Sequence, residues 1–256
     1  MTGLLHSFGG NLSPALYLLF FTGALLVGMS KAGLSGLGIA FVPLLALVFG
    51  AKESTGVVLP MLIAADIMAV SYYHRHAVWK HIYRVLPWAA AGIIVALIVG
   101  KYINNNQFRF ILITIVWAML ALTLINDLFI KKHESEVPDN LLFASLMGFV
   151  GGFSTMIGNS AGPVFTLYFL SMRLPKNEFV GTNAWLFLLL NAGKMPLQIL
   201  VWKNITWHSF LTSMSAVPLI VLGIYIGIKI VKLLPEKAYR YFVIIATLLT
   251  SVLLFL

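Results

Sequence analysis

The sequence contains no cysteine, and only 10% of its 256 residues are charged. Without cysteine the chain has no disulfide, no thiol nucleophile and no thiolate-bound metal. Soluble domains carry a charged fraction of about a quarter. The scarcity of charge and a hydrophobic content of 60% exclude an ordinary soluble domain. The chain is therefore expected to be an integral membrane protein.

Several motifs of enzymes and ATPases are also missing. No Gly-x-x-x-x-Gly-Lys-Ser/Thr loop occurs, so the chain itself is not expected to consume ATP. Neither His-Glu-x-x-His nor a pair of intramembrane aspartates is present, which argues against a membrane-embedded enzyme. His74, His76 and His81 have no carboxylate or cysteine close by in sequence. We interpret them as an interfacial loop and expect no metal and no cofactor.

What the sequence does contain is long apolar runs. A spanning helix needs about 20 apolar residues. The first dozen residues hold no lysine or arginine, so a cleaved signal peptide is not expected. The fold predicted is all-α and polytopic, with about ten transmembrane segments. These are 14–30, 34–50, 54–73, 84–101, 107–130, 140–157, 160–173, 178–202, 207–231 and 238–256.

Two stretches, Gly28–Pro43 and Gly152–Leu167, interrupt apolar runs with glycine, serine and other polar residues. Hydrocarbon tolerates irregular backbone only where it is buried in protein or lines a wet cavity. We therefore expect helices broken near mid-membrane at both places. The first two segments, and the sixth with the seventh, could instead form re-entrant hairpins, which would leave fewer full crossings.

The two halves of the chain resemble each other when small gaps are allowed, which indicates a duplication. We divide the chain into a first membrane repeat, 1–132, and a second, 133–256, which together form one transport domain. Five segments per repeat is an odd number, so the second copy would be inverted in the membrane. Aligned pairs include Gly28 with Gly152, Lys52 with Lys176, Asp66 with Asn191, Pro87 with Pro218 and Arg109 with Arg240.

The positive charges agree with an inverted repeat. The net charge of +9 comes from lysines and arginines between apolar runs, so it indicates orientation rather than nucleic-acid binding. If every segment crosses, Lys52, Lys101, Arg109 and Lys203 lie on one side, and the other lysines and arginines, apart from Lys194 inside the eighth segment, lie on the opposite, cytoplasmic side. Both termini are then non-cytoplasmic, in what we expect to be a bacterial inner membrane.

At these motifs the chain resembles the TauE/SafE sulfite exporter family, also called the toluene-sulfonate uptake permease group. The resemblance rests on Gly33, Gly36, Gly38, Pro43 and Leu44 in the first half, and on Gly158, Gly162 and Gly181-Thr182-Asn183 in the second. The usual glycine triplets are replaced by Gly36-Leu37-Gly38 and Ser160-Ala161-Gly162. The resemblance implies transport of small anions such as sulfite or organosulfonates, coupled to protons.

A broken helix exposes backbone N–H groups at the start of its second part, and these groups with the helix dipole favour an anion. Small residues at the breaks also allow helices to pack closely, without any role in binding. We predict that the substrate-binding residues gather at the two breaks and on the eighth segment. They are Ser30, Lys31, Ser35, Gly36, Ser154, Thr155, Asn159, Ser160, Asn191 and Lys194.

Asp66 and Lys194 each lie near the middle of an apolar segment. A lone charge at the bilayer centre costs at least about 2.5 kcal/mol, so each needs a partner or water. We expect the two to approach each other, with Asp66 coupling the proton and Lys194 attracting the anion; a fixed structural ion pair is the alternative. Lys31 is either an interfacial lysine or a charge inside a cavity.

The function predicted is a secondary active transporter of a small anion, with alternating access. A passive anion channel is the alternative, because broken helices also build selectivity filters. A membrane-embedded enzyme is less favoured. The expected partners are the small anionic substrate, protons and the lipid bilayer.

Overall fold

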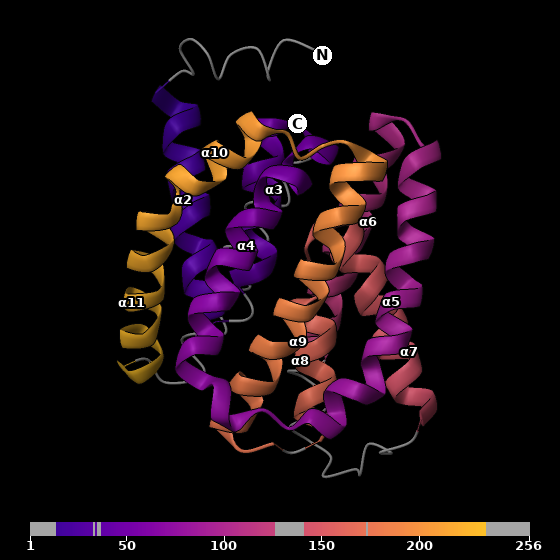
Figure 1. Cartoon of the computed structure of the whole chain (residues 1–256), viewed down its shortest axis with the longest axis vertical. Helices are drawn as coiled ribbons and strands as arrows, with labels where there is room; N and C mark the ends of the chain where they lie inside the picture. The colour runs from indigo at the N-terminus through magenta and orange to yellow at the C-terminus, as the bar shows by residue number, and fades with distance from the viewer. Residues whose placement is uncertain (1–13, 33, 35–36, 126–140, 173, 234–256) are drawn as a thin grey trace.

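The computed structural model describes residues 14–32, 34, 37–125, 141–172 and 174–233, and within these ranges it is helical without any strand. Most of the described helices follow one another after short connections (Figure 1). The α-helices are α2 (Pro14–Lys31), α3 (Leu37–Phe49), α4 (Ala51–Tyr73), α5 (Trp79–Tyr102), α6 (Asn105–Ile125), α7 (Leu141–Gly158), α8 (Gly162–Ser171), α9 (Lys176–Leu197), α10 (Trp207–Ser215) and α11 (Val217–Leu233). A 3₁₀ turn, η2 (His74–His76), follows α4, and a π-helical turn, η4 (Gln198–Trp202), follows α9.

The predicted all-α membrane fold is confirmed at this level. Five described helices are long and apolar enough to cross a membrane, or six if α10 and α11, bent by 41°, form one span. Every expected segment up to residue 231 contains a helix, and the expected segment 238–256 lies outside the described residues.

Both expected breaks are present, and the lengths of the helices that follow them bear on whether the chain crosses fully or forms hairpins. The first separates α2 from α3, and the second separates α7 from α8. Helix α3 has 13 residues and α8 has 10. At 1.5 Å per residue they are roughly 20 and 15 Å long, too short for a hydrocarbon core of about 30 Å. Ten full crossings are therefore not confirmed, and within the described residues both pairs have the form of the re-entrant hairpins.

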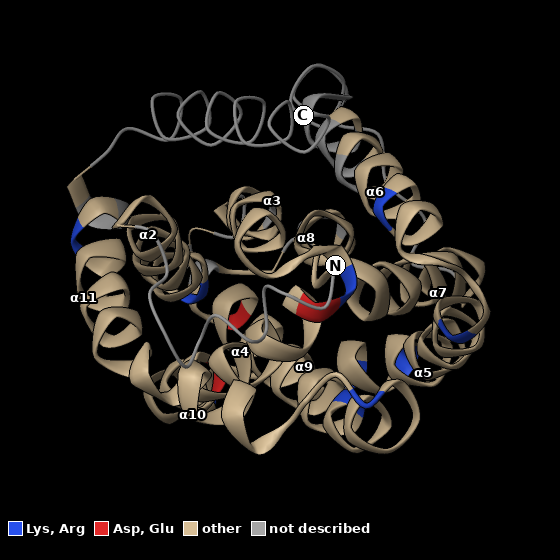
Figure 2. Ribbon diagram, turned by 90° about the horizontal axis from the view of Figure 1, so that it is seen from above, with Lys and Arg blue, Asp and Glu red and all other residues tan. Residues whose placement is uncertain are grey.

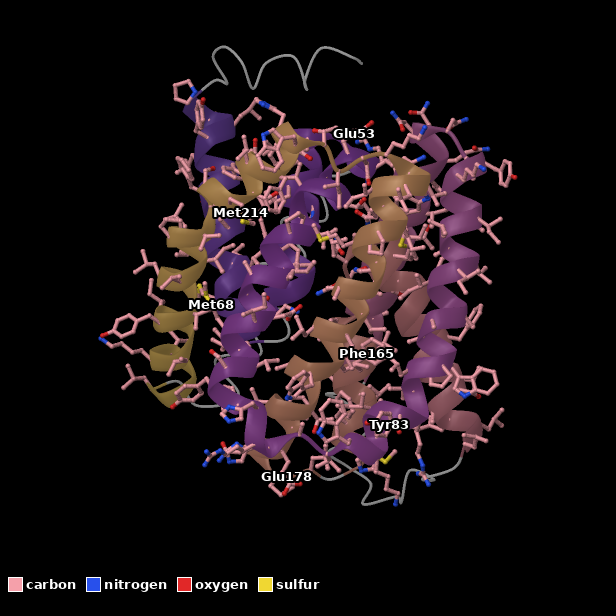
Figure 3. All side chains as sticks on the ribbon, viewed as in Figure 1. Glu53, Met68, Tyr83, Phe165, Glu178 and Met214 are labelled. Atoms are coloured by element: carbon pink, nitrogen blue, oxygen red, sulfur yellow. The ribbon has the colours of Figure 1, made fainter. Side chains whose placement is uncertain are left out.

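The two hairpins enter the molecule from opposite ends. Helix α3 returns to the upper end in Figure 1, where α2 began, whereas α8 returns to the lower end. The helices that follow also run oppositely: Glu53 in the first turn of α4 is at the top of Figure 3, and Glu178 in the first turn of α9 is at the bottom. Each hairpin tip therefore reaches the interior, beside the middle of α4 and α9.

Viewed from above, α3, α4, α8 and α9 lie between two groups, α2 with α10 and α11 on one side and α5 with α6 and α7 on the other (Figure 2). Helix α5 packs on α7 and α11 packs on α2. Glycines let the backbones meet: a Cβ at Gly152 would strike the backbone of Ala89, and one at Gly223 would strike that of Leu25. Such matched contacts are what an inverted duplication would produce; the duplication itself stays a prediction.

The hairpins leave the charge argument unchanged. Two crossings and one hairpin both return the chain to the side from which it came, so the loops keep their predicted sides. Only Lys31 leaves the count, because it ends α2 at the hairpin tip. The orientation in the membrane stays a prediction.

We expect Gly152→Ala to destabilise the protein, because the added Cβ meets backbone atoms of Ala89 that cannot rotate away. Overpacking of this kind costs about 1–3 kcal/mol. The matched control is Gly193→Ala in α9, where nothing lies within 4 Å of the added Cβ. Thermal unfolding in detergent should show a lower melting temperature for Gly152→Ala alone. Equal melting temperatures would contradict the close packing of α5 on α7.

Candidate functional site

A pocket lies where the two hairpin tips meet α4 and α9, and we call it the central pocket. Its lining includes Gly38 in the first turn of α3 and Gly162 at the start of α8, so both broken helices begin at its wall. It leaves about 40 Å³ for the centres of water molecules, room for a few waters. Its polar lining residues are Ser30, Lys31, Thr155, Asn159, Asn183 and Asn191.

A buried ion pair stands beside this pocket. Lys31 Nζ at the tip of the first hairpin lies 2.7 Å from Asp66 Oδ1 on α4, and the Asp66 side chain is fully buried. Asn191 Nδ2 on α9 donates to the other carboxylate oxygen, Oδ2, at 2.6 Å. Asp66 is therefore held by one cation and one amide, which satisfies the need for a partner that its depth creates.

Lys31 is the cation that reaches the central pocket. Its side chain is 11% exposed, and its ammonium lies 4.0 Å from the centre of the Phe187 ring. An ammonium carries three N–H groups, and the carboxylate of Asp66 engages the side of the group that faces α4. The cavity interpretation of Lys31 is thus correct, and the interfacial one is not.

The ammonium of Lys194 is bonded to the second hairpin tip and not to Asp66. Its ammonium is fully buried and donates to Thr155 O at 2.9 Å, Thr155 Oγ1 at 2.8 Å and Asn159 Oδ1 at 2.8 Å. These three acceptors use all three N–H groups. They lie at the C-terminal end of α7, where a positive charge also complements the helix dipole. Lys194 therefore fastens the second hairpin tip to α9.

The expected contact of Asp66 with Lys194 is replaced by the pair with Lys31. Lys194 follows Asn191 by three residues on α9, near enough to Asp66 for an electrostatic interaction but not bonded to it. Helical spacing correctly placed Asn191 and Lys194 on one face. It gave no information on which of the two lysines faces Asp66.

The other predicted residues divide between the pocket wall and the protein around it. Ser30, Thr155, Asn159 and Asn191 line the pocket with Lys31. Ser154 donates instead to Val150 O at 2.7 Å, and Ser160 lies near Ser154 O at 3.5 Å. Ser35 and Gly36 lie outside the described residues.

Sequence reasoning missed Phe187 and did not include Asn183 among the predicted binding residues. Both line the pocket on the face of α9 that carries Asn191. The spacing of four residues from Asn183 to Phe187 and from Phe187 to Asn191 is the signal that identifies them. The side-chain oxygens of Asn183 and Asn191 are buried without a hydrogen-bond partner in the described part of the chain. The oxygen of such an amide can accept a hydrogen bond from a polar ligand. If the amide group is flipped, its NH₂ group can donate one instead.

The pocket extends toward one end of the molecule. Its lining includes Phe179 and Val180 in the first turns of α9, at the lower end in Figure 3 near Glu178. On the opposite side lie three residues in contact, Asn159, Thr55 and Asn204, which we call the Thr55 partition. Asn159 Nδ2 lies 3.5 Å from Thr55 O, and Asn204 Nδ2 donates to Thr55 Oγ1 at 2.9 Å.

The arrangement therefore offers a cation, hydroxyl and amide groups and two helix N-termini to an anion, next to a carboxylate that can hold a proton. Among the described residues no group of three metal-ligating side chains lies together.

Residues 19–254 match the family model described as sulfite exporter TauE/SafE. No curated protein and no solved structure matches the chain significantly.

We expect Lys194→Met to destabilise the protein strongly, because it leaves the buried side-chain oxygens Thr155 Oγ1 and Asn159 Oδ1 without their donor. A buried polar atom left without its hydrogen-bond partner costs about 1–3 kcal/mol. Thermal unfolding in detergent should show a much lower melting temperature than for Lys229→Met, which removes an exposed lysine from α11. A melting temperature equal to that of Lys229→Met would contradict the fastening role.

Proposed function

Because this chain belongs to the sulfite exporter TauE/SafE family, we propose that it is a secondary transporter that carries a small anion, sulfite or an organosulfonate, together with protons by alternating access. The observation that carries the proposal is a pocket between two interrupted helices with a lysine ammonium in its wall and a buried carboxylate behind it. Interrupted helices near the centre of inverted repeats are the usual setting of transporter sites.

In this proposal the anion binds to Lys31. The ammonium provides charge, while Thr155 and Asn159 provide polar groups around it. The Ser30 hydroxyl donates to Val27 O at 2.8 Å, so it has to rotate before it can donate to the anion. The first turns of α3 and α8 add positive dipole ends at Gly38 and Gly162. The oxygens of a sulfonate or of sulfite match such a set of donors arriving from several directions.

Proton coupling follows from competition for Lys31. A bound anion takes the place of the Asp66 carboxylate as the counter-charge of the ammonium. Asp66 is fully buried, so a carboxylate left without its cation is costly there. Taking up one proton converts it into a neutral acid, and Lys31 keeps its own proton throughout. When the anion leaves, Lys31 pairs with Asp66 again and the proton is released.

Alternating access needs one open and one closed side. The central pocket extends toward the start of α9, and in this proposal the Thr55 partition closes it on the other side. If the lower end faces the cytoplasm, as the positive charges predict, this is the inward-facing state. The partition also separates the proposal from a passive channel, which would need a continuous path.

A flux experiment distinguishes the transporter from the channel. Protein in proteoliposomes should accumulate radiolabelled sulfite above its equilibrium level when an inwardly directed proton gradient is imposed. A protonophore should abolish this accumulation. A channel would only equilibrate the anion with the membrane potential, whatever the proton gradient.

We expect Asp66→Asn to separate anion exchange from proton coupling. Asparagine resembles the neutral acid, so exchange of labelled for unlabelled sulfite should persist while accumulation driven by the proton gradient is lost. Glu178→Gln in the first turn of α9 removes a carboxylate away from the ion pair and serves as the control. Undiminished accumulation by Asp66→Asn would remove Asp66 from the coupling step.

A further inference from the structure

A second pocket lies on the other side of the Thr55 partition, and we call it the upper vestibule. It leaves about 320 Å³ for the centres of water molecules, much more than the central pocket. It is formed where the starts of α4, α6 and α10 meet the end of η4, at the upper end in Figure 1. Its lining includes Lys52, Glu53, Asn105, Trp202, Lys203 and Asn204.

The charges in this vestibule favour an anion. The lining contains two lysines, Lys52 and Lys203, and one carboxylate, Glu53. Lys52 Nζ is fixed by donating to Gly100 O at 2.7 Å and lies 5.6 Å from the Trp202 ring centre. The Lys203 side chain is exposed and forms no ion pair within the described part of the chain. Its backbone is left-handed, with φ 53°, where η4 ends.

Three helix starts add to this positive charge. Helices α4, α6 and α10 all begin at the vestibule wall, and each N-terminus carries about half a positive charge. Gly50, the residue before α4, provides no side-chain cap. Glu53 in the first turn of α4 offsets part of the charge, so we expect weak binding. Weak binding suits a site that an anion must leave quickly.

The vestibule is one residue away from the central pocket. Asn204 lines the vestibule and donates to Thr55 Oγ1, while Asn159 lines the central pocket and approaches Thr55 O. Gln198 lies between Lys194 and Trp202 on the same helical run. Its side chain is fully buried, and neither polar atom has a hydrogen-bond partner in the described residues. A buried amide without partners costs about 1–3 kcal/mol, so Gln198 is an unusual residue to find in this helical run.

We propose that the upper vestibule is a second binding site for the transported anion, a small oxyanion such as sulfite or a sulfonate. This second proposal rests on the proposed function. In it, the vestibule holds the anion at the end of the molecule opposite to the opening of the central pocket. When the Thr55 partition opens, the anion passes Gln198 between Lys203 and Lys31.

Binding is measured on the purified full chain by fluorine NMR with trifluoromethanesulfonate as the probe. Lys31→Gln removes the cation of the central pocket, so the binding that remains reports on the vestibule. Adding Lys203→Gln should weaken the remaining binding roughly three- to tenfold, the effect of one partly exposed charge. Adding Lys101→Gln instead removes an exposed lysine near the same end of the molecule, outside the vestibule lining, and should leave it unchanged.

Equal weakening by Lys203→Gln and Lys101→Gln would overturn the proposal, because general surface charge would then explain the binding. Loss of all binding in Lys31→Gln would overturn it too, provided that its thermal unfolding curve shows a folded protein; Lys31→Gln with Asp66→Asn, which leaves no unpaired carboxylate, gives the same test if the single variant does not fold. These outcomes do not depend on transport, so they are distinct from a failure of the proposed function. In flux measurements Lys203→Gln should raise the KM for sulfite supplied to the upper end, while the KM from the other end stays the same.

Discussion

The buried pair of Lys31 with Asp66 is the interaction on which the rest of the site depends. It joins the tip of the first hairpin to the middle of α4, at a distance of 2.7 Å. Two isolated charges would be costly at this depth, and pairing lowers the cost without removing it. In the proposed function this pair exchanges partners, because the bound anion replaces the carboxylate when a proton neutralises Asp66. Anion binding and proton uptake are then the same step.

The second hairpin is held differently, although its place in the fold is equivalent. Lys194 gives all three of its hydrogen bonds to Thr155 and Asn159, so its charge is committed to the protein. The two interrupted helices are therefore unlike: one tip carries a cation into the pocket, and the other receives a cation from α9. In the proposed function, the substrate would therefore contact a lysine whose counter-charge can change on the first hairpin, and a hairpin tip held by fixed hydrogen bonds on the second.

Much of this architecture is predictable from sequence, because glycine, serine and polar residues clustered within an apolar run favour irregular backbone. The breaks after α2 and α7 and the depth of Asp66 follow from that rule. The hairpins could not be predicted in this way, because the apolar stretches at 34–50 and 160–173 are compatible with either a full crossing or a re-entrant hairpin. The partner of Asp66 was also hidden, because helical periodicity relates Asn191 to Lys194 but says nothing of a lysine on another hairpin. Phe187 escaped notice since an aromatic residue in a membrane helix is ordinary.

The thinness of the Thr55 partition has an electrical consequence. If the central pocket is wet and continuous with the cytoplasmic solution, the membrane voltage cannot fall across it and is focused on the short stretch between Asn159 and Asn204. A charge that passes this stretch crosses most of the field within a few ångströms, a difference of about 2.3 kcal/mol per 100 mV. The resting potential of the cell would then act on the gating step itself, and the direction of net flow would follow the voltage as well as the concentrations.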